Sequence, residues 1–540
     1  MAARGSSTVD AIRLIVDTTR SAWKAKRIAT LMSLDLASAF PKTNHQRLLY
    51  NLQRIGILSQ IISFIKSFLT NRRTKLALPG FLSDWQEVKT GIPQGSPLSP
   101  ILFMLFAAEL LEKLENQGVY NIGFADDVNI LAIGKTTKET CEKLERVHHI
   151  CIDWAERHGA KFAPEKYKVI HLTRRNLQAQ EKQRLPNIGI LNPPVDTLRV
   201  LGVTLDKRLY WKAQVQEIAI KAKRMEGAIK RITASTWGSP ALAGKTLYKA
   251  IIQSVIGYAS EVWYSKDLPK TTLQSLQKIQ NSCLRTILGA YKATPIPILH
   301  EELGLPLVKD YLSTRKHKFQ LGRLGTRQEK YRDWIIQTVN NRLGQLPPMD
   351  LLEEKKATLE NQRKLAIAGN GLARFSEMKK RKKQIKEFFQ GETIRLRQQA
   401  WDNYRANNYL PPVYQDQPWQ EDRSRVYKGL SKPQCAILVQ LRSEVIGTAA
   451  FLHKRKVPGY ESPNCLCGER QTTSHLLLLC PNLRQQRQQL IQKTNTANRI
   501  SWYNKYPYEL SSWAIRNLDL GQFRWTRDNY KAVFDTTKEG

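Results

Sequence analysis

Two adjacent aspartates, Asp126 and Asp127, lie at the centre of an apolar segment that runs from Tyr120 to Ala132. Burying two like charges side by side costs several kcal/mol unless a cation offsets them. The flanking residues alternate between apolar and small or polar side chains, which is typical of β-strands. The segment therefore predicts a tight hairpin with both carboxylates at its tip, where oxygen ligands suit magnesium. An acidic surface turn without a metal explains the pair equally well.

A third aspartate, Asp35, ends a second apolar run that begins at Ile28 and predicts a buried strand. A helical pattern of apolar residues follows from His45. If Asp35 lies beside the hairpin, the three carboxylates form a two-metal site. Such a site holds cations about 3.5–4 Å apart and clamps the attacking and leaving oxygens of a phosphoryl transfer. This chemistry depends on the proximity of Asp35 to the pair, which is an expectation.

Between the two acidic segments, residues 91–100 contain two glycines and three prolines, and the apolar stretch Ile101 to Leu114 follows them. Little regular structure is expected before the helix predicted for that stretch. Gly95-Ser96-Pro97 suits a backbone that approaches a ligand closely and then starts a helix. An ordinary loop with a helix N-cap is the alternative interpretation.

In combination, these segments resemble the palm of the reverse transcriptases of non-LTR (LINE-type) retrotransposons, in their fungal-like form. The matching segments follow the family's order from motif A to motif E: Leu34 to Phe40, Gly91 to Pro100, Phe124 to Asp127, Phe162 to Lys166, and Leu201 to Val203. The resemblance implies an α+β right-hand polymerase. It would have a palm of antiparallel sheet and helices, incomplete fingers, a helical thumb and a helical, basic C-terminal region.

The resemblance also implies roles for four charged residues. Asp35, Asp126 and Asp127 would be the catalytic aspartates that hold two magnesium ions. Lys166 would be the motif D lysine near the pyrophosphate leaving group, and a solvated lysine is the other interpretation. The implied reaction is RNA-directed DNA synthesis, in which deoxynucleotides are added to the 3′-hydroxyl of a primer.

Three uncharged residues receive roles by the same resemblance. Phe40 matches the aromatic side chain that screens the 2′ position of the nucleotide and favours deoxynucleotides. Gln94 and Gly95 would lie against the template and the incoming nucleotide. Pro41 stands where many relatives have a second aspartate, but that residue is not a metal ligand in the family.

The charge of the chain indicates a polyanionic partner. Its 540 residues include 85 Lys and Arg against 47 Asp and Glu, a formal net charge of +38. This predicts salt-dependent nucleic-acid binding, here to an RNA template and a DNA primer or target. The sequence has no run of about 18 or more apolar residues that would span a membrane, and the oligomeric state is open.

The cysteine content and the N-terminus bear on the compartment. Seven cysteines are spread thinly through the chain, which suggests a reducing compartment without a disulfide framework. The N-terminus lacks the apolar core of a signal peptide. We expect a nuclear location, and a mitochondrial presequence is the alternative.

The segment Gly5 to Ile12 resembles the family's stretch that opens a fingers-to-palm helix, with Ser7 or Thr8 as its cap. This placement implies that the chain begins inside the fingers. The expectation is an N-terminally truncated protein without the upstream fingers strands or an endonuclease domain. The alternative function is therefore a catalytically inactive nucleic-acid-binding remnant of a retroelement. A group II intron or telomerase-type enzyme is a third, less favoured hypothesis.

The resemblance, together with a change of composition after residue 314, implies four parts in sequence order. They are a fingers remnant and palm (1–210), a thumb and connection (211–314), a basic helical region (315–430) and a C-terminal region (431–540). Apolar periodicity predicts further elements, which are a helix at 136–158, strands at 167–172 and 198–204, and helices from 211, at 247–263 and at 273–288.

Cys465, Cys467, His475 and Cys480 form a C-x-C-x7-H-x4-C pattern. Three thiolates and one imidazole are a common ligand set for structural zinc. A buried Cys/His cluster without metal is the alternative. Many LINE-type proteins end in a Cys-Cys-His-Cys motif, so the resemblance favours zinc in a folded nucleic-acid-binding tail, with Arg487 among the nearby cations. The other four cysteines lack ligand spacing and are expected to be core thiols.

Overall fold

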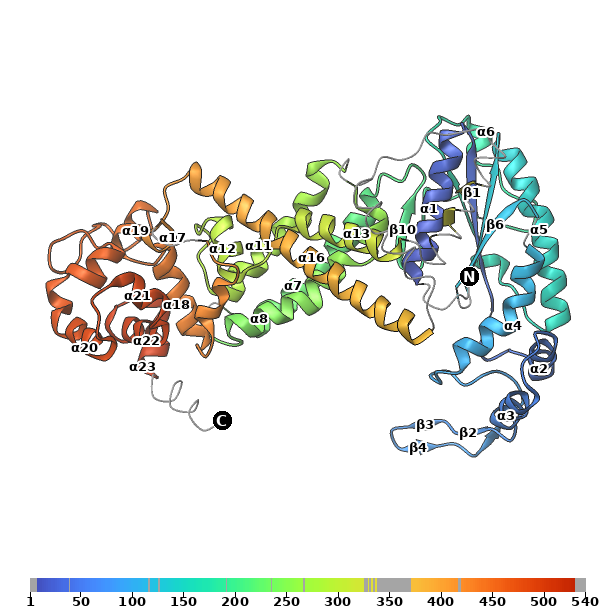
Figure 1. Ribbon diagram of the computed structural model, residues 1–540, viewed down its shortest axis with the longest axis horizontal. Helices are drawn as coiled ribbons and strands as arrows, with labels where there is room; N and C mark the ends of the chain where they lie inside the picture. Colours follow the sequence, from blue (N-terminus) through green and yellow to red (C-terminus); the bar gives the residue numbers. More distant parts are fainter. Residues whose placement is uncertain are drawn as a thin grey trace. The chain divides into compact units, whose positions relative to one another are not determined.

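The computed structural model describes most of the chain between residues 7 and 529. The described ranges are 7–37, 39–114, 117–124, 127–190, 192–234, 236–265, 268–324, 329, 332–333, 336–337, 371–415 and 419–529, without the side chains of Phe124 and residues 371–379. They belong to two compact units, each described by itself below (Figure 1). The first unit comprises Met1–Gln214, Glu261–Trp263 and Arg323–Arg374, and the second comprises Val215–Ser260, Tyr264–Gly322 and Phe375–Gly540.

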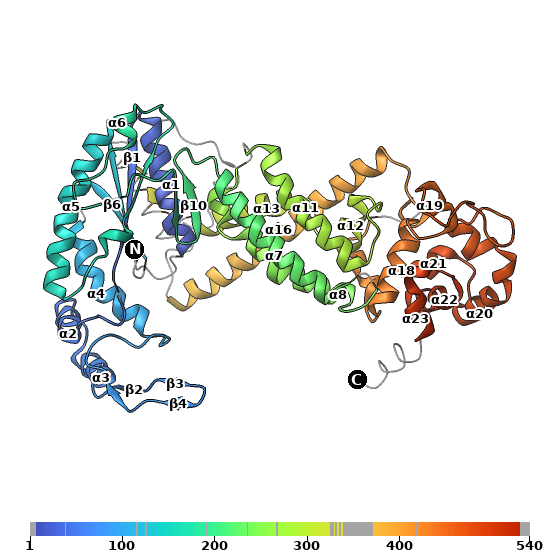
Figure 2. The same ribbon diagram turned by 180° about the vertical axis from the view of Figure 1, so that it is seen from behind.

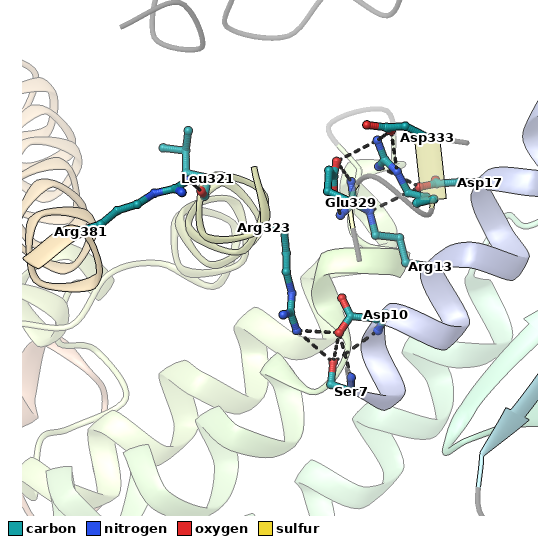
Figure 3. A network of polar contacts seen from close by, with 10 residues as sticks. Ser7, Asp10, Arg13, Asp17, Leu321, Arg323, Glu329, Asp333 and Arg381 are labelled. Atoms are coloured by element: carbon teal, nitrogen blue, oxygen red, sulfur yellow. Dashed lines mark hydrogen bonds and ion pairs between the residues drawn. The ribbon is translucent and has the colours of Figure 1, made fainter. Parts of the chain in front are cut away.

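Helix α1 (Thr8–Lys24) opens the first unit with the predicted cap. Ser7 and Asp10 form a capping box, in which the Asp10 carboxylate accepts from the Ser7 backbone N–H at 2.9 Å. The guanidinium of Arg323 donates to the same carboxylate at 2.6 Å (Figure 3). A charge-assisted bond of this kind fixes the start of α1 against a residue more than 300 positions away in the chain.

Two more ion pairs bind the segment after Arg323 to α1, one turn further along the helix. Arg13 donates to the carboxylate of Glu329 at 3.0 Å, and Arg332 donates to that of Asp17 at 3.3 Å (Figure 3). These side chains are largely buried, so the pairs are screened less than surface pairs are. Arg323, Glu329 and Arg332 therefore anchor to α1 within the first unit.

A four-stranded antiparallel sheet forms the centre of the first unit, in the order β6-β7-β1-β8. Strands β6 (Val119–Phe124) and β7 (Asp127–Gly134) pair as the predicted hairpin, with Phe124 opposite Asp127. Strand β1 (Ile28–Asp35) pairs with β7, and β8 (Lys168–Leu172) pairs with β1. The strands predicted at 28–36, in the hairpin and at 167–172 are thus confirmed.

One face of this sheet packs on the core that Met32 and Leu34 join, and Asp35 and Asp127 point to the other face. Met32 and Leu34 of β1 belong to a core that includes residues of α4 (Ser99–Leu114) and α5 (Thr137–His158). Figures 1 and 2 show α1 and α5 on opposite sides of the sheet. Because side chains alternate along a strand, Asp35 points away from the core that holds Leu34. Asp127 precedes the core residue Val128 and points to the same face as Asp35.

The remaining described elements of the first unit connect these layers. They are α2 (His45–Arg54), α3 (Ser59–Leu69), β2 (Arg73–Thr74), β3 (Ala77–Leu78), β4 (Phe81–Leu82), β5 (Gln86–Glu87), the 3-10 helix η1 (Pro164–Lys166), α6 (Ala179–Lys182), β9 (Thr197–Val200) and β10 (Val203–Asp206). The helices predicted from His45, at 101–114 and at 136–158 are confirmed as α2, α4 and α5.

The single strand predicted at 198–204 is wrong. Leu201 and Gly202 both have positive φ, 48° and 81°, and they turn the chain between β9 and β10. Two consecutive residues with positive φ are the mark of a tight hairpin turn. The apolar run hid this turn because Leu201 rarely adopts such a conformation.

Helices dominate the described part of the second unit. They are α7 (Lys212–Ile232), α8 (Ala241–Tyr248), α9 (Ser254–Gly257), α10 (Ser260–Trp263), α11 (Lys270–Leu288), α12 (Ile296–Leu303), α13 (Val308–Arg323), α16 (Gly371–Ala406), α17 (Pro412–Gln415), α18 (Lys432–Ser443), α19 (Ala449–Lys454), α20 (Arg484–Thr494), α21 (Arg499–Asn504), α22 (Pro507–Asn517) and α23 (Arg524–Asp528), and some of them extend across the boundary between the units. Short π and 3-10 segments lie between them, namely η2 (Lys249–Gln253), η3 (Arg423–Tyr427), η4 (His475–Leu479), η5 (Pro481–Leu483) and η6 (Gly521–Phe523).

The predicted helices from 211 and at 273–288 are confirmed as α7 and α11, whereas the continuous helix predicted at 247–263 is wrong. That stretch passes from α8 through the π segment η2 into α9, and Ala259 has φ 49° before α10. A left-handed residue ends the helical hydrogen-bond ladder. Within the described ranges, none of the helices has both the length and the apolar composition needed to cross a membrane.

A buried ion pair joins α12 to the C-terminal part of the second unit. Glu302 is completely buried, and its carboxylate accepts from Nε of Arg442 in α18 at 3.0 Å and from the hydroxyls of Tyr414 and Tyr427 at 2.6 Å each. Burial by itself raises the pKa of Glu302, but Arg442 and the two hydroxyls outweigh it, so the pKa is lowered. The ionised carboxylate therefore ties α12 to α17, η3 and α18.

Candidate active site and metal centre

Asp35 and Asp127 face each other across strands β1 and β7, in register. Side chains directly opposite in an antiparallel pair have Cβ atoms about 4.5–5.5 Å apart, and like charges there destabilise the sheet. The Asp35 side chain is 40% exposed, so it is open to a ligand. The expected proximity of the strand-end aspartate to the hairpin is confirmed for Asp127. Asp126 lies outside the described residues.

Lys166 reaches the same place from a different element. Its ammonium donates to the carboxylate of Asp35 at 2.9 Å. Ala163 donates its backbone N–H to the carbonyl of Asp35 at 3.0 Å, so the segment before η1 is fixed beside the end of β1. The hydrogen bond and charge of Asp35 raise the pKa of Lys166. Lys166 is therefore the counter-ion of Asp35 in this structure.

The loop after β1 and the loop before α4 are joined through backbone hydrogen bonds. Gly91 donates to Thr43, and Ile92 donates to the carbonyl of Phe40, both at 2.9 Å. Gly91 has φ 80°, and a Cβ on it would lie 2.8 Å from the Phe40 carbonyl oxygen. This position requires glycine because the two loops approach too closely for any side chain.

Two side chains that the sequence did not single out also hold Gly91. Arg72 donates to the Gly91 carbonyl at 2.6 Å, and the His45 ring contacts the same oxygen at 2.7 Å. No motif or spacing marks either residue, because the contact depends on how α2 and the β2–β5 hairpin fold back onto the loop. Their position makes them candidates for holding the loop that contains Gln94.

Phe40, Gln94 and Gly95 differ in how firmly they are held. Phe40 is half-buried and packs edge-on against Phe103, with ring centroids 5.3 Å apart. Gln94 and Gly95 are exposed, and Gly95 has φ 89° with no atom near the position of a Cβ. This geometry leaves the loop tip open to a ligand while its base is fixed to the Phe40 carbonyl.

The second unit contains the four predicted metal ligands in one cluster. The ligand atoms of Cys465, Cys467, His475 and Cys480 all lie within 4.8 Å of one another. The Cys465 and Cys480 sulfurs are 3.8 Å apart, and the Cys467 sulfur is 3.1 Å from His475 Nε2. Zn–S bonds of about 2.3 Å in a tetrahedron place two sulfurs about 3.8 Å apart. The residues therefore fit zinc.

Electrostatics at this cluster favour a metal ligand. Burial alone raises the pKa of Cys465, but hydrogen bonds from the Cys467 backbone, His475 and the neighbouring thiols lower it to about 6. The thiolate is the form that binds metal. Burial instead raises the pKa of Cys141, Cys151 and Cys283 to about 12, as expected for core thiols.

Arg487 lies beside the cluster, as the sequence suggested, and it contacts backbone carbonyls there. It donates to the carbonyl of Leu477 at 2.9 Å and to that of Cys480 at 2.8 Å. Its guanidinium therefore fixes the backbone beside a metal ligand, and we expect it to contribute to the shape of the cluster. The sequence showed only an arginine near the cysteines, because backbone acceptors leave no trace in a motif.

Comparison with known proteins finds similarity to one family in the part of the chain that contains Asp35 and Asp127. Residues 3–205 match the family model described as Reverse transcriptase (RNA-dependent DNA polymerase). The first unit therefore contains a reverse transcriptase domain. The relatives described next are RNA-directed DNA polymerases or Pol polyproteins of transposable elements.

Three curated relatives illustrate the similarity. The chain is 24% identical to the probable RNA-directed DNA polymerase from transposon X-element of Drosophila melanogaster, over 66% of this chain and 38% of the relative. It is 24% identical to the polymerase from mobile element jockey of the same species, over 58% and 34%. It is 26% identical to the Pol polyprotein from retrotransposable element R1 of Nasonia vitripennis, over 41% and 68%.

The matched part is thus little more than a third of the length of the first two relatives. Among solved structures, apo telomerase from Candida tropicalis shares 12% identity over 62% of this chain and 57% of that chain, with a TM-score of 0.30.

Proposed function

We propose that the chain is an RNA-directed DNA polymerase that extends a primer on an RNA template. The juxtaposition of Asp35 and Asp127 across β1 and β7 carries the proposal. In the proposed step, the primer 3′-oxygen bonds to the α-phosphorus of a deoxynucleoside triphosphate, and pyrophosphate leaves. Asp35, Asp127 and Asp126 would hold two magnesium ions, since paired carboxylates are the ligands that this cation prefers. When bound, such cations neutralise charge on the attacking and leaving oxygens.

Other residues of the first unit would position the substrates. Phe40 is held from two sides, by Phe103 and by the backbone bond to Ile92, and a fixed ring suits the exclusion of a 2′-hydroxyl. Gln94 and Gly95 would contact the template and the incoming nucleotide from the exposed loop tip. Lys166 would release Asp35 to the metal and turn its ammonium towards the leaving pyrophosphate.

Primer extension on an RNA template with magnesium tests the activity. Asp35→Asn, Asp126→Ala and Asp127→Asn should each lower the rate at least about a hundredfold, as loss of transition-state charge stabilisation does. The matched control is Asp84→Asn, an exposed aspartate on the β2–β5 hairpin, which should retain the rate. Synthesis that persists in Asp126→Ala would reject this assignment.

The second candidate is a nucleic-acid-binding remnant without catalysis. The net charge of +38 favours it, because charge alone supports binding to a polyanion. This candidate predicts no incorporation of deoxynucleotides, together with salt-sensitive binding that is the same in Asp126→Ala. Incorporation by the unaltered chain that depends on Asp126 would exclude it.

We also propose that Cys465, Cys467, His475 and Cys480 hold one structural zinc ion in a knuckle-like module. The four convergent ligand atoms support this. Metal analysis of the purified full chain should give one zinc, and Cys467→Ser should lose most of it. Cys435→Ser, which alters a buried thiol outside the cluster, is the matched control. Unchanged zinc in Cys467→Ser would reject the ligand set.

The partners follow from this function. We propose an RNA template, a DNA primer or target and deoxynucleoside triphosphates as the ligands, and a nuclear location. Helices α7 to α11 would be the thumb that tracks the template–primer duplex. The basic run from Met378 to Lys386, of which the structure describes the side chains from Lys380 onward, would add phosphate contacts.

A further inference from the structure

The tip of the zinc-binding turn carries a leucine that is almost completely exposed. Leu466 lies between Cys465 and Cys467, and 99% of its surface is accessible, the highest value among the large apolar side chains that the structure describes. Single exposed leucines are common on protein surfaces and need no explanation by themselves. Three features distinguish Leu466 from an ordinary exposed leucine. They are the hydrogen-bonded turn that carries it, a second exposed leucine at the same centre, and the positive charge of the sequence around it.

Backbone hydrogen bonds fix the turn on which Leu466 lies. Cys465 donates to the carbonyl of Glu469 at 2.7 Å, and Gly468 donates to that of Cys465 at 2.9 Å. Gly468 has φ 93°, which allows this tight geometry. Because both neighbours of Leu466 are metal ligands in the proposed centre, the side chain is held outward and cannot fold back onto the protein.

A second leucine projects from the same centre. Leu479 is 71% exposed and precedes Cys480, whose sulfur is 3.8 Å from that of Cys465. In contrast, Leu476 and Leu477 of the same π segment are buried, at 6% and 0% exposed. Two leucines of this segment therefore pack inward, whereas Leu479 stays in water beside the metal ligands that also anchor Leu466.

The sequence around these two leucines is positively charged. Residues 451–493 contain seven Lys and Arg against two Glu, a net charge of +5 from 7 minus 2. The exposed cations include Arg470, Arg484 and Lys454 to Lys456. A protein partner that buried these leucines would also need negative charges to offset the cations. A nucleic acid supplies both, because its phosphates are negative and the faces of its stacked bases are apolar.

We propose that the knuckle tip, defined here as Leu466 and Leu479, is a wedge that enters between two stacked bases of a duplex held by the surrounding cations. Leucine is among the apolar side chains that proteins insert between base steps to unstack them. Single-stranded binding relies instead on aromatic platforms, and residues 463–483 contain no Phe, Tyr or Trp. The proposal rests on the zinc centre proposed above and adds its substrate class, a stacked duplex.

The test uses the full zinc-loaded chain and a short DNA duplex that carries 2-aminopurine, whose fluorescence rises when it is unstacked. The unaltered chain should bind and raise the fluorescence. Leu466→Ala should weaken binding about tenfold, the loss expected for one unburied leucine, and should abolish the fluorescence rise. Leu466→Met should restore both. Leu82→Ala, which truncates a 61% exposed leucine of the first unit, is the matched control.

Zinc content is measured on every variant and separates the two proposals. If the unaltered chain lacks zinc, both the proposed metal centre and the wedge that rests on it are rejected. If zinc is present and Leu466→Ala binds and unstacks the duplex like the unaltered chain, only the wedge is overturned, and the tip serves a protein partner instead. Weaker binding with an undiminished fluorescence rise also overturns the wedge, because it shows contact without insertion.

Discussion

Replacing Gly91 by alanine tests how the two loops of the active site are held together. Gly91 has φ 80°, a conformation that costs a residue with a Cβ about 1–2 kcal/mol. The added Cβ would also lie 2.8 Å from the Phe40 carbonyl oxygen and closer still to that of Pro41. The loop carrying Phe40 must therefore move away from Gly91.

The magnitude follows from the bonds that this movement breaks. The contacts from Gly91 to Thr43 and from Ile92 to Phe40 are both 2.9 Å long and cannot survive a shift of the Phe40 and Pro41 carbonyls. At about 1 kcal/mol for each hydrogen bond, Gly91→Ala should lower the free energy of unfolding by about 3–4 kcal/mol in total.

Gly95→Ala separates backbone strain from the close approach. Gly95 has φ 89°, but no atom lies within 4 Å of the position of its Cβ. It should therefore lose only the strain of about 1–2 kcal/mol. Urea denaturation of both variants, followed by circular dichroism, measures the difference. Equal losses would refute the argument that the two loops are held by this close approach.

Three further predictions concern charged and titratable groups. Glu302→Gln leaves Arg442 buried without its counter-charge and should cost about 3–5 kcal/mol in urea denaturation, whereas Glu302→Gln combined with Arg442→Met should recover most of that loss. Burial lowers the pKa of His300 from 6.5 to about 4, so the unfolded chain takes up the proton first. Stability should therefore fall by up to about 3 kcal/mol as the pH drops through this window, and an equal fall in His300→Gln would contradict this. Lys166→Met removes the cation that competes for Asp35 and should tighten Mn²⁺ binding a few-fold in a titration followed by electron paramagnetic resonance; an unchanged midpoint would argue against that competition.

Local patterns in the sequence predicted much of the first unit. The run ending at Asp35 and the hairpin around Asp127 alternate strongly enough to define strands, and Ser7 with Asp10 defines a helix start. The pattern failed at 198–204 and at 247–263. At both places a residue other than glycine adopts positive φ, Leu201 in one case and Ala259 in the other. Propensity disfavours this conformation, and surrounding packing imposes it.

The sequence likewise predicted one part of the candidate zinc site and missed another. The spacing of Cys465, Cys467, His475 and Cys480 indicated one ligand set, and their atoms converge. The same spacing could not show that the Arg487 guanidinium donates hydrogen bonds to the carbonyls of Leu477 and Cys480. Side chains that bond to backbone carbonyls follow no repeat, so these contacts can be seen only once the chain is folded.

The sequence by itself determined the chemical character of this protein. Its ordered motifs resemble a reverse transcriptase palm, and residues 3–205 match the family model for that domain. The aspartates in apolar segments favour a bound cation, and the charge of +38 favours a polyanionic partner. Only the tertiary structure decided which groups meet. The pairing of β1 with β7 sets Asp35 against Asp127, and η1 brings Lys166 to Asp35 from 131 residues away. Such contacts depend on sheet register and loop closure, which short-range patterns do not encode.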